Sequence, residues 1–420
     1  MTARKNVTEV ALSSKSHIEC PYATYRSLHG SGEVGFDPEI GLAVVSYDDL
    51  VSMSKNTAGF SSSISIDDQG PRHMGVGEDP VQDDVEEIFR DAHPMVNALF
   101  TADPPVHTRH RKLLSKALNP RRVRALEPHI RAIADDLIDK FVANGKVDLL
   151  PEFSVPLPVT VIADVLGVDR ADLWRFKDWG DLMISGNIDL LNHEQRRRVA
   201  KAVVELHQYF VPRIEDRRAN PTDDLLSEMV NAREDGEEPL GTEELLPIID
   251  QVLLAGHETT TNLVGNGVLV LLNNPVLANR LRDDLSVIDR FVEEVLRWDP
   301  PIQCTYRRAT EDCQVSGAEV KKGDLVLPVW GAAGYDPSVF ASPTEFDIDR
   351  PNVSKHMGFG HGPHFCAGAE LARLEARIAF EVLLTRLPNL TLDEANSDLS
   401  RLPSFASHGY ERICLTFDVT

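Results

Sequence analysis

A cysteine in a glycine-rich turn is the clearest sign of chemistry in this sequence. Cys366 lies in Phe359-Gly360-His361-Gly362-Pro363-His364-Phe365-Cys366-Ala367-Gly368, directly before a helical pattern over 369–384. Glycines let backbone amides approach a sulfur, and a helix start stabilises a thiolate through its dipole and its unpaired N–H groups. The segment therefore predicts a thiolate ligand for a metal. Zinc held by His361, His364 and Cys366 is one alternative, although no fourth ligand suggests itself, and an inert cysteine is another.

Weak helix formers interrupt an apolar helical pattern over 248–264. Its centre reads Gly256-His257-Glu258-Thr259-Thr260-Thr261, and the glycine alone costs about 1 kcal/mol in a helix. Threonine hydroxyls can bond back to carbonyls one turn earlier and open a groove. Glu258 beside Thr259 then supplies an acid with a hydroxyl relay. A satisfied polar pair inside a core helix is the alternative.

Two further pairs lie one helical turn apart. Glu294 and Arg297 can form an ion pair just before Pro300-Pro301 ends their helix. His107 and Arg111 share a face at i, i+4, which suits the binding of an anion. Each pair alone is common on solvated helices.

Helices must position most of these residues, and a smaller number of strands the rest. No repeat or low-complexity linker divides the chain, so we expect a single domain over 1–420 that is mainly α with a smaller β-rich lobe. The segment over 119–123 predicts a helix break before a long amphipathic run to Asn144, and apolar periodicity predicts further helices over 171–182, 193–218, 222–233, 242–273 and 276–298. Strand patterns occur as a hairpin over 33–47, around turns over 313–330, and over 411–419.

Composition narrows the classes of partner. Of 420 residues, 43 are Lys or Arg and 66 are Asp or Glu, and the net charge of −23 argues against binding nucleic acid or anionic membranes. The sequence has no apolar run of membrane-spanning length and no signal-peptide core. Five scattered cysteines suit a reducing compartment. We therefore expect a cytoplasmic protein.

Together, in this order and spacing, the four motifs resemble those of the cytochrome P450 family, specifically its soluble bacterial members. The cysteine segment fits the family pattern Phe-Gly-x-Gly-x-His-x-Cys-x-Gly at every fixed position. The Ala-Gly-His-Glu-Thr-Thr and Glu-x-x-Arg segments fit as well. The resemblance runs from about residue 35 to the C-terminus, which makes about 1–34 an N-terminal extension and 35–420 the catalytic body. It implies the family's triangular prism of helices around a buried haem.

The resemblance also implies roles for individual residues. Cys366 is the ligand of the iron of haem b (iron protoporphyrin IX), in a turn built with Phe359, Gly360 and Gly368. The haem propionates are bound by His107, Arg111, Arg307 and His364. Oxygen binding and proton delivery involve Gly256, Glu258 and Thr259, and Leu254, Ala255 and Gln303 face the substrate. Glu294, Arg297 and Arg350 form a structural ion-pair triad.

The activity implied is that of a monomeric haem-thiolate monooxygenase. It would activate O2 with two external electrons and hydroxylate a mostly apolar molecule of terpenoid, steroid or aromatic class. Electrons would come from a ferredoxin and an NAD(P)H-dependent ferredoxin reductase, since no flavin or iron–sulfur motif remains in the chain. A peroxide-driven peroxygenase and a non-catalytic haem sensor are the alternatives.

Two surface segments complete the expectations. The substrate should be enclosed by the loop over 61–100, the helix pair around 180–200 and the turn near Phe405. The acidic residues that crowd the first loop are read as solvated (Glu78, Asp79, Asp83, Asp84, Glu86 and Glu87). From Pro104 to Leu126 there is no acidic residue but there are seven basic ones, including Arg121 and Arg122. Together with Arg373 and Arg377, which the resemblance puts on the same face, they predict a docking patch for an acidic ferredoxin.

Overall fold

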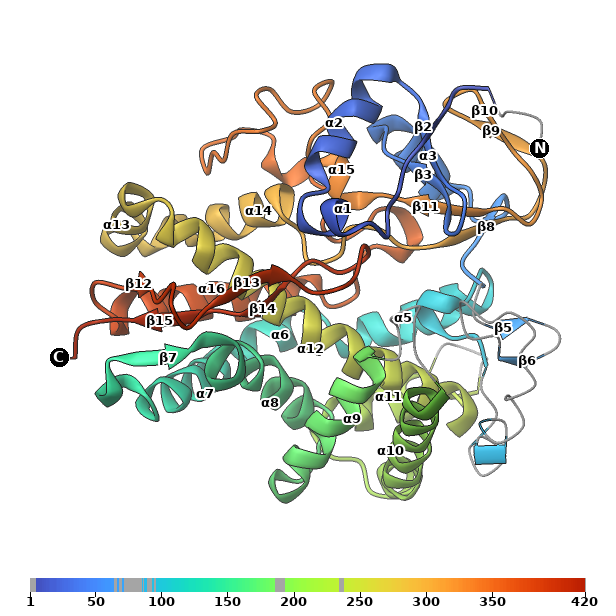
Figure 1. Ribbon diagram of the computed structural model, residues 1–420. Coiled ribbons are helices and arrows are strands. Elements are labelled where there is room, and N and C mark those ends of the chain that lie inside the picture. Colours follow the sequence, from blue (N-terminus) through green and yellow to red (C-terminus); the bar gives the residue numbers. More distant parts are fainter. Residues whose placement is uncertain are drawn as a thin grey trace. The chain divides into compact units, whose positions relative to one another are not determined.

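The computed structural model describes residues 5–63, 66–67, 70–71, 85, 87–88, 93, 96–185, 193–233 and 238–419. The chain forms two compact units, whose elements are labelled in Figure 1. One unit contains Met1–Ser62, Glu127–Leu157 and Thr259–Thr420, and the other contains Ser63–Leu126 and Pro158–Glu258. The predicted fold class, mainly α with a smaller β-rich part, is confirmed. Across the described ranges, none of the helices has the length and apolar character needed to cross a membrane.

A six-stranded sheet organises one end of the first unit. Its strand order is β1-β2-β3-β11-β8-β4, with bounds Val7–Glu9, Val34–Asp37, Gly41–Val44, Leu325–Pro328, Arg307–Ala309 and Phe60–Ser61. β2 and β3 are the predicted hairpin, paired antiparallel. β1 pairs in parallel with β2, so residues of the expected N-terminal extension belong to this sheet. Leu50 and Met53 of α3 (Tyr47–Lys55) pack on it.

The remaining strands of the first unit form small sheets. β9 (Cys313–Val315) pairs with β10 (Ala318–Val320), and β13 (Asp398–Arg401) pairs with β14 (Tyr410–Arg412). β15 (Cys414–Thr416) lies between β12 (Thr391–Leu392) and β7 (Lys146–Asp148). Helices of this unit are α1 (Lys15–Glu19), α2 (Tyr22–Ser31), α7 (Glu127–Asp139), α13 (Pro275–Asp283), α14 (Ile288–Trp298), α15 (Trp330–Ala333) and α16 (Ala369–Arg386).

The second unit is built from helices. They are α5 (Val106–Ala117), α6 (Pro120–Ala125), most of α8 (Pro156–Val165), α9 (Leu173–Ser185), α10 (His193–Ala219) and α11 (Leu225–Asn231). α10 packs against α9 and α11, and α11 packs against α5. A short pair of strands, β5 (Ile66–Asp67) and β6 (Gly70–Pro71), belongs to the same unit.

One long helix, α12 (Thr242–Leu272), contributes to both units. Its residues up to Glu258 belong to the second unit and those from Thr259 onward to the first. Residues 245–253 and 260–269 are all buried, as the apolar pattern predicts. The weak helix formers at its centre do not break it.

Two predicted helical runs are each divided in the structure. The break predicted over 119–123 is instead the start of α6, with Asn119 as its N-cap, and the run to Asn144 is interrupted before α7, where Pro128, which has no N–H to donate, stands in the first turn. The run over 276–298 becomes α13 and α14, because the Asp284 side chain accepts from the Ser286 N–H and caps a short turn between them. Apolar periodicity continues across both breaks, which is why the sequence alone does not show them.

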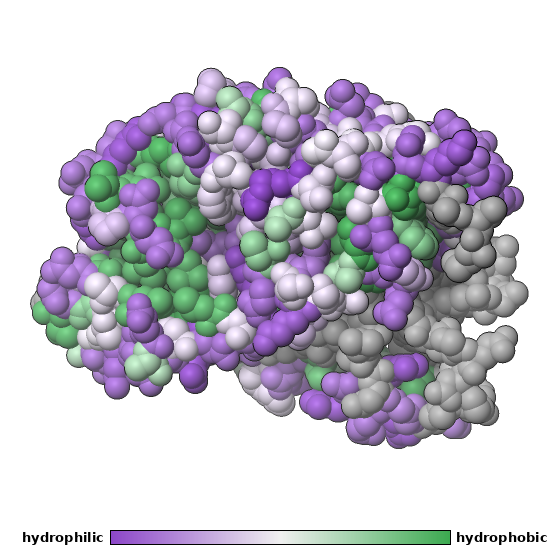
Figure 2. Space-filling view, turned by 45° about the horizontal axis from the view of Figure 1, so that its top comes forward, coloured by the Kyte–Doolittle hydropathy of each residue, from purple (hydrophilic) through white to green (hydrophobic). Residues whose placement is uncertain are grey.

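Hydrophilic residues cover much of the face drawn in Figure 2, as the strongly acidic composition leads one to expect. Hydrophobic residues gather in recesses between them (Figure 2). Several predicted walls of the substrate site lie outside the described residues: most of the 61–100 loop, including Glu78, Asp79, Asp83, Asp84 and Glu86, and residues 186–192 of the 180–200 region.

Candidate functional site

The Cys366 loop lies between a short 3-10 turn (Gly362–His364) and α16. The N–H of Cys366 donates to the carbonyl of Phe359 at 2.9 Å, which closes the loop on itself. Gly360 and Gly362 have φ of 70° and 73°, a region that L side chains rarely adopt. A Cβ on Gly362 would also come within 2.7 Å of the Ser54 carbonyl oxygen. The glycines of the motif are therefore needed for the shape of the loop.

The two histidines of the loop interact with serines far away in the sequence. His361 Nδ1 lies 2.9 Å from Ser54 Oγ, and His364 Nε2 lies 3.1 Å from Ser62 Oγ. Burial and the nearby Lys55 charge lower the pKa of His361. Within the described part of the chain, no three His, Cys, Asp or Glu residues are grouped as a metal ion would need. The zinc alternative therefore has no support there.

The loop offers one sulfur ligand, Cys366, and this suits a metal ion that already sits in an organic cofactor and takes its other ligands from it. Residues 358–368 are all half-exposed or exposed, although α16 directly after them is largely buried. A Cβ on Gly368 would meet nothing within 4 Å. A flat group could therefore approach this loop closely. Haem needs only an axial donor from the protein, because its porphyrin supplies the remaining nitrogens, so the donor set fits haem.

An arginine and a glutamate form an ion pair next to the Phe359 ring of the loop. The Arg373 guanidinium lies 4.6 Å from the centre of the Phe359 ring and donates to Glu293 at 2.6 Å. His356 Nε2 lies 3.1 Å from the same carboxylate. Burial raises the pKa of Glu293, but the hydrogen bonds and charges of His356 and Arg373 outweigh it and lower this pKa to about 2. Glu293 thus stays ionised and holds Arg373 over Phe359.

Between residues 245 and 269 of α12, only the middle contains residues that are not buried. Leu254, Gly256, Glu258 and Thr259 are half-exposed, and Ala255 is exposed. A Cβ on Gly256 would lie 3.4 Å from Ile162, an ordinary van der Waals contact, so this part of α12 packs against α8. The predicted acid and alcohol therefore belong to the one accessible stretch between residues 245 and 269.

A buried carboxyl that the sequence does not reveal contacts α12 at Thr260. Glu375 of α16 is buried and shares a hydrogen bond with the Thr260 side chain of α12. Burial raises the pKa of Glu375 to about 8, and the Thr260 hydrogen bond offsets part of that rise. The only sequence signal is an acidic residue at a position where the pattern of α16 expects an apolar one.

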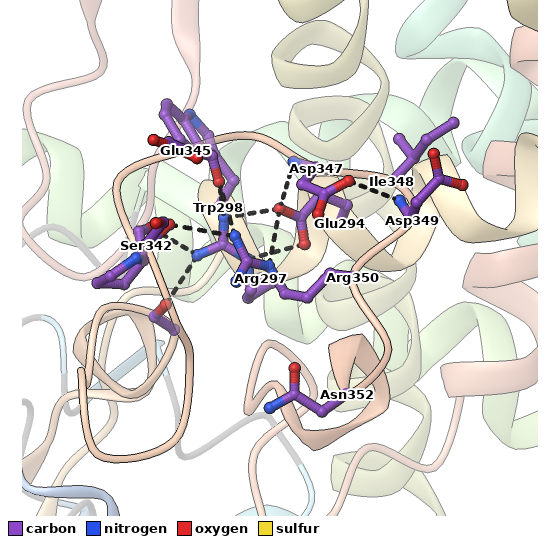
Figure 3. A network of polar contacts seen from close by, with 12 residues as sticks. Glu294, Arg297, Trp298, Ser342, Glu345, Asp347, Ile348, Asp349, Arg350 and Asn352 are labelled. Atoms are coloured by element: carbon purple, nitrogen blue, oxygen red, sulfur yellow. Dashed lines mark hydrogen bonds and ion pairs between the residues drawn. The ribbon is translucent and has the colours of Figure 1, made fainter.

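The predicted ion-pair triad is assembled in the first unit (Figure 3). Arg297 Nη2 lies 2.7 Å from Glu294 Oε1 and Arg350 Nε lies 3.4 Å from the same oxygen. The side chains of Glu294 and Arg297 are both 0% exposed. Arg297 also donates to the carbonyls of Gly334, Pro343 and Glu345. The triad therefore ties α14 to the irregular segment over 334–350, away from any open surface.

The other predicted cofactor residues are found in separate units. His107, buried, and Arg111, half-exposed, lie on α5 of the second unit. Arg307 lies on β8 of the first unit, where its Nη1 donates to the Tyr306 carbonyl at 2.6 Å. Their role toward propionates stays a prediction.

The Gln303 side chain is buried within the first unit and binds other protein groups. Its side chain is buried, its Oε1 accepts from Tyr25 Oη at 2.8 Å, and its Nε2 donates to the Pro300 carbonyl at 2.7 Å. A Cβ on Gly331 would come within 2.1 Å of the same amide. Both ends of the amide therefore bind protein groups, and a role of Gln303 toward substrate stays a prediction.

Comparison with known proteins identifies the family. The family model described as Cytochrome P450 matches residues 173–405. Cytochrome P450 107B1 of Saccharopolyspora erythraea is 40% identical over 316 residues, which cover 75% of this chain and 76% of that protein. The chain belongs to the cytochrome P450 family. This P450 is therefore a monooxygenase of the oxidoreductase class, and its cofactor is haem b.

Solved structures confirm the P450 fold. CYP109Q5 from Chondromyces apiculatus has a TM-score of 0.85 and 33% identity, with 99% of each chain covered. CYP109E1 from Bacillus megaterium in complex with testosterone has a TM-score of 0.81 and 32% identity, covering 95% of this P450 and 99% of that chain. Both matches cover at least 95% of this P450.

Proposed function

We propose that this P450 holds haem iron through Cys366 and hydroxylates a mostly apolar small molecule with electrons from external redox proteins. The observation that carries the proposal is the Cys366 loop, a thiol at the start of α16 in a turn that glycines keep open on one side. The bound haem supplies the activation of O2, favoured by electron density from the thiolate. The protein supplies the ligand, the protons and the control of water.

The loop residues would have distinct tasks around the haem. Phe359 packs against Phe365, with ring centres 6.1 Å apart, and keeps an aromatic face beside the sulfur. Gly360 and Gly368 leave room for the porphyrin. His364, together with His107, Arg111 and Arg307, would bind the propionates, whose negative charge needs cations or N–H donors.

Replacing Cys366 tests the proposal directly. The reduced carbon-monoxide complex of the haem-loaded protein should show the red-shifted Soret band of thiolate ligation, and Cys366→His should lose both that band and hydroxylation. Cys313→Ser is the matched control, because Cys313 is another partly exposed free cysteine of the same unit. An imidazole-type band in the wild-type protein would refute the proposal.

Thr259 and Glu258 would manage protons on the other side of the haem. Their side chains lie on the accessible stretch of α12, which also contains half-exposed Gly256. The Thr259 hydroxyl can hold a proton in place for the reacting oxygen, and the Glu258 carboxyl can pass protons inward from solvent. This acid and alcohol favour an O2-activating enzyme over a peroxide-driven one, which has no need of them.

The substrate should contact the apolar positions of the same stretch, Leu254 and Ala255. A mostly uncharged molecule of terpenoid, steroid or aromatic size suits them, and the complex of CYP109E1 with testosterone supports the steroid class. A screen of such ligands for the low-spin to high-spin shift of ferric haem tests this. A protein that shifts with none of these ligands, but with charged ones, would contradict the class.

Electrons would come from an acidic ferredoxin and its NAD(P)H-dependent reductase. The basic segment of the second unit supports this, but part of its charge is used internally. Arg109 pairs with Glu244, and Arg122 pairs with Asp223 and Glu228. Arg121 and Arg124 are exposed and are therefore the better candidates for docking.

Turnover of NAD(P)H with added ferredoxin and reductase separates this function from a haem sensor. The cytoplasmic location and monomeric state stay predictions.

A further inference from the structure

A strained turn in the second unit requires an explanation. Leu99 has φ of 41°, a left-handed conformation that is unfavourable for a residue with a Cβ. The turn is closed by Thr101, whose Oγ1 accepts from the Ala98 N–H at 3.1 Å and donates to the Ala98 carbonyl at 2.9 Å. Such strain persists only where neighbouring groups hold the backbone in place, and it often marks a functional position.

The Gln251 side chain of α12 is the main group that holds this turn. Its Nε2 donates to the Ala98 carbonyl at 2.8 Å, and its Oε1 accepts from the Phe100 N–H at 3.0 Å. Gln251 is only 8% exposed, so both hydrogen bonds are shielded from water. One amide thus binds the residues on both sides of strained Leu99.

A histidine of α5 binds the residue between them. His110 Nδ1 accepts from the Leu99 N–H at 3.3 Å, and its Nε2 lies 3.1 Å from Glu244 Oε1. Burial raises the pKa of Glu244, but hydrogen bonds from the Gly241 N–H and His110 and the Arg109 charge outweigh it and lower that pKa. Because Nδ1 accepts from the Leu99 N–H, the ring N–H at Nε2 is the one that faces Glu244. Residues 98–100 are therefore each fixed to a helix.

The fixed turn presents an aromatic ring. Phe100 is 48% exposed, whereas the residues that hold its backbone are buried. Gln251 lies three and four residues before Leu254 and Ala255, so these three side chains share one face of α12. All of them belong to the second unit. The hydrogen bond from Phe100 N–H to Gln251 therefore places Phe100 one helical turn from the accessible stretch of α12.

We propose that Gln251 is a positioning residue for the substrate: its amide fixes Phe100 beside Leu254 and Ala255, so that the ring forms part of the apolar wall. The inference rests on the proposed function, since it assigns a ligand to that stretch of α12. The simplest alternative is that Gln251 only satisfies the hydrogen bonds of buried backbone groups. In that case, replacing Gln251 would change the stability of the protein but not its affinity for large ligands.

A double-mutant cycle on the haem-loaded protein separates the two roles. The variants are Gln251→Leu, Phe100→Ala and the pair. The probes are clotrimazole, a bulky azole, and imidazole, which both bind ferric haem through nitrogen and give spectral dissociation constants. Gln251→Leu should weaken clotrimazole binding about tenfold and imidazole binding less than about twofold. In the Phe100→Ala background the same change should have an effect below about twofold.

Equal losses from Gln251→Leu in both backgrounds, or equal losses for both azoles, would overturn the inference. Asn231→Leu is the matched control, because its amide also hydrogen-bonds to the backbone in the second unit, at the carbonyls of Arg217 and Ser227. Gln251→Glu keeps the acceptor for Phe100 and loses the donor to Ala98, so it should give an intermediate loss of clotrimazole affinity. It serves as the second test variant if Gln251→Leu folds poorly. Absence of the thiolate-type carbon-monoxide band would instead defeat the proposed function.

Discussion

Neutralising Glu375 should stabilise the protein, and more so at higher pH. In the unfolded chain this carboxyl loses its proton near its usual pKa of 4.5, whereas in the folded protein burial holds the pKa at about 8. Between these values the folded state binds one more proton than the unfolded state. The free energy of unfolding therefore falls as pH rises, by about 1.4 kcal/mol per pH unit.

Glu375→Gln removes this pH dependence and keeps a side chain that can hydrogen-bond to Thr260. From about pH 5.5 to about pH 7.5, the advantage of the variant over wild type should grow by about 3 kcal/mol, an upper bound for full burial of the charge. Equilibrium urea unfolding of the haem-loaded protein at both pH values measures it. Absorption of the haem and circular dichroism should be followed together, because cofactor loss can precede unfolding.

Glu370→Gln is the control on the same helix, since the Glu370 side chain is 58% exposed and stays in water in both states. Its advantage over wild type should be the same at both pH values. If Glu375→Gln gives an advantage that changes by less than about 1 kcal/mol across the range, the carboxyl is ionised in the folded protein at neutral pH, and the reasoning fails.

Three further predictions concern the buried ion-pair triad, the proton path and the docking of the electron donor. Glu294→Ala should destabilise the protein by about 3–5 kcal/mol in urea unfolding, because it leaves buried Arg297 without its carboxylate; a loss below about 1 kcal/mol would contradict this. Thr259→Ala should consume NAD(P)H while releasing hydrogen peroxide in place of product, and full coupling on a good substrate would show another proton route. Arg121→Glu and Arg124→Glu should slow the first electron transfer from an acidic ferredoxin and flatten its salt dependence, with ligand-induced spin shifts unchanged; equal rates across ionic strength would exclude docking there.

Local sequence patterns predict the elements well because each depends on near neighbours. The 33–47 hairpin and the span of α12 were predictable from alternation and periodicity alone. The breaks before α7 and after α13 were not, since the apolar pattern continues across them. One proline and one aspartate cap decide these breaks, and their effect depends on where the chain must turn to pack.

The chemistry of the Cys366 loop is also local, but its support is not. The loop's residues lie within ten positions of one another, so the motif could be read directly. Ser54 and Ser62, which bind its histidines, lie about 300 residues away, and nothing in their own surroundings marks them. The same holds for Glu375, whose pKa is raised by burial, with a smaller opposing effect of Thr260 on another helix. Long-range packing decides these contacts.

Two glutamines show why residue type and motif position do not settle a role. The family resemblance placed Gln303 against the substrate, yet its amide binds Tyr25 and Pro300 within the protein. Gln251 carries no motif, yet its amide holds a strained turn one helical turn from the accessible part of α12. A buried amide must satisfy its donor and its acceptor, and the groups that satisfy them determine what it positions. For Gln251 those groups lead to Phe100, which makes an unmarked residue the better candidate for shaping the pocket.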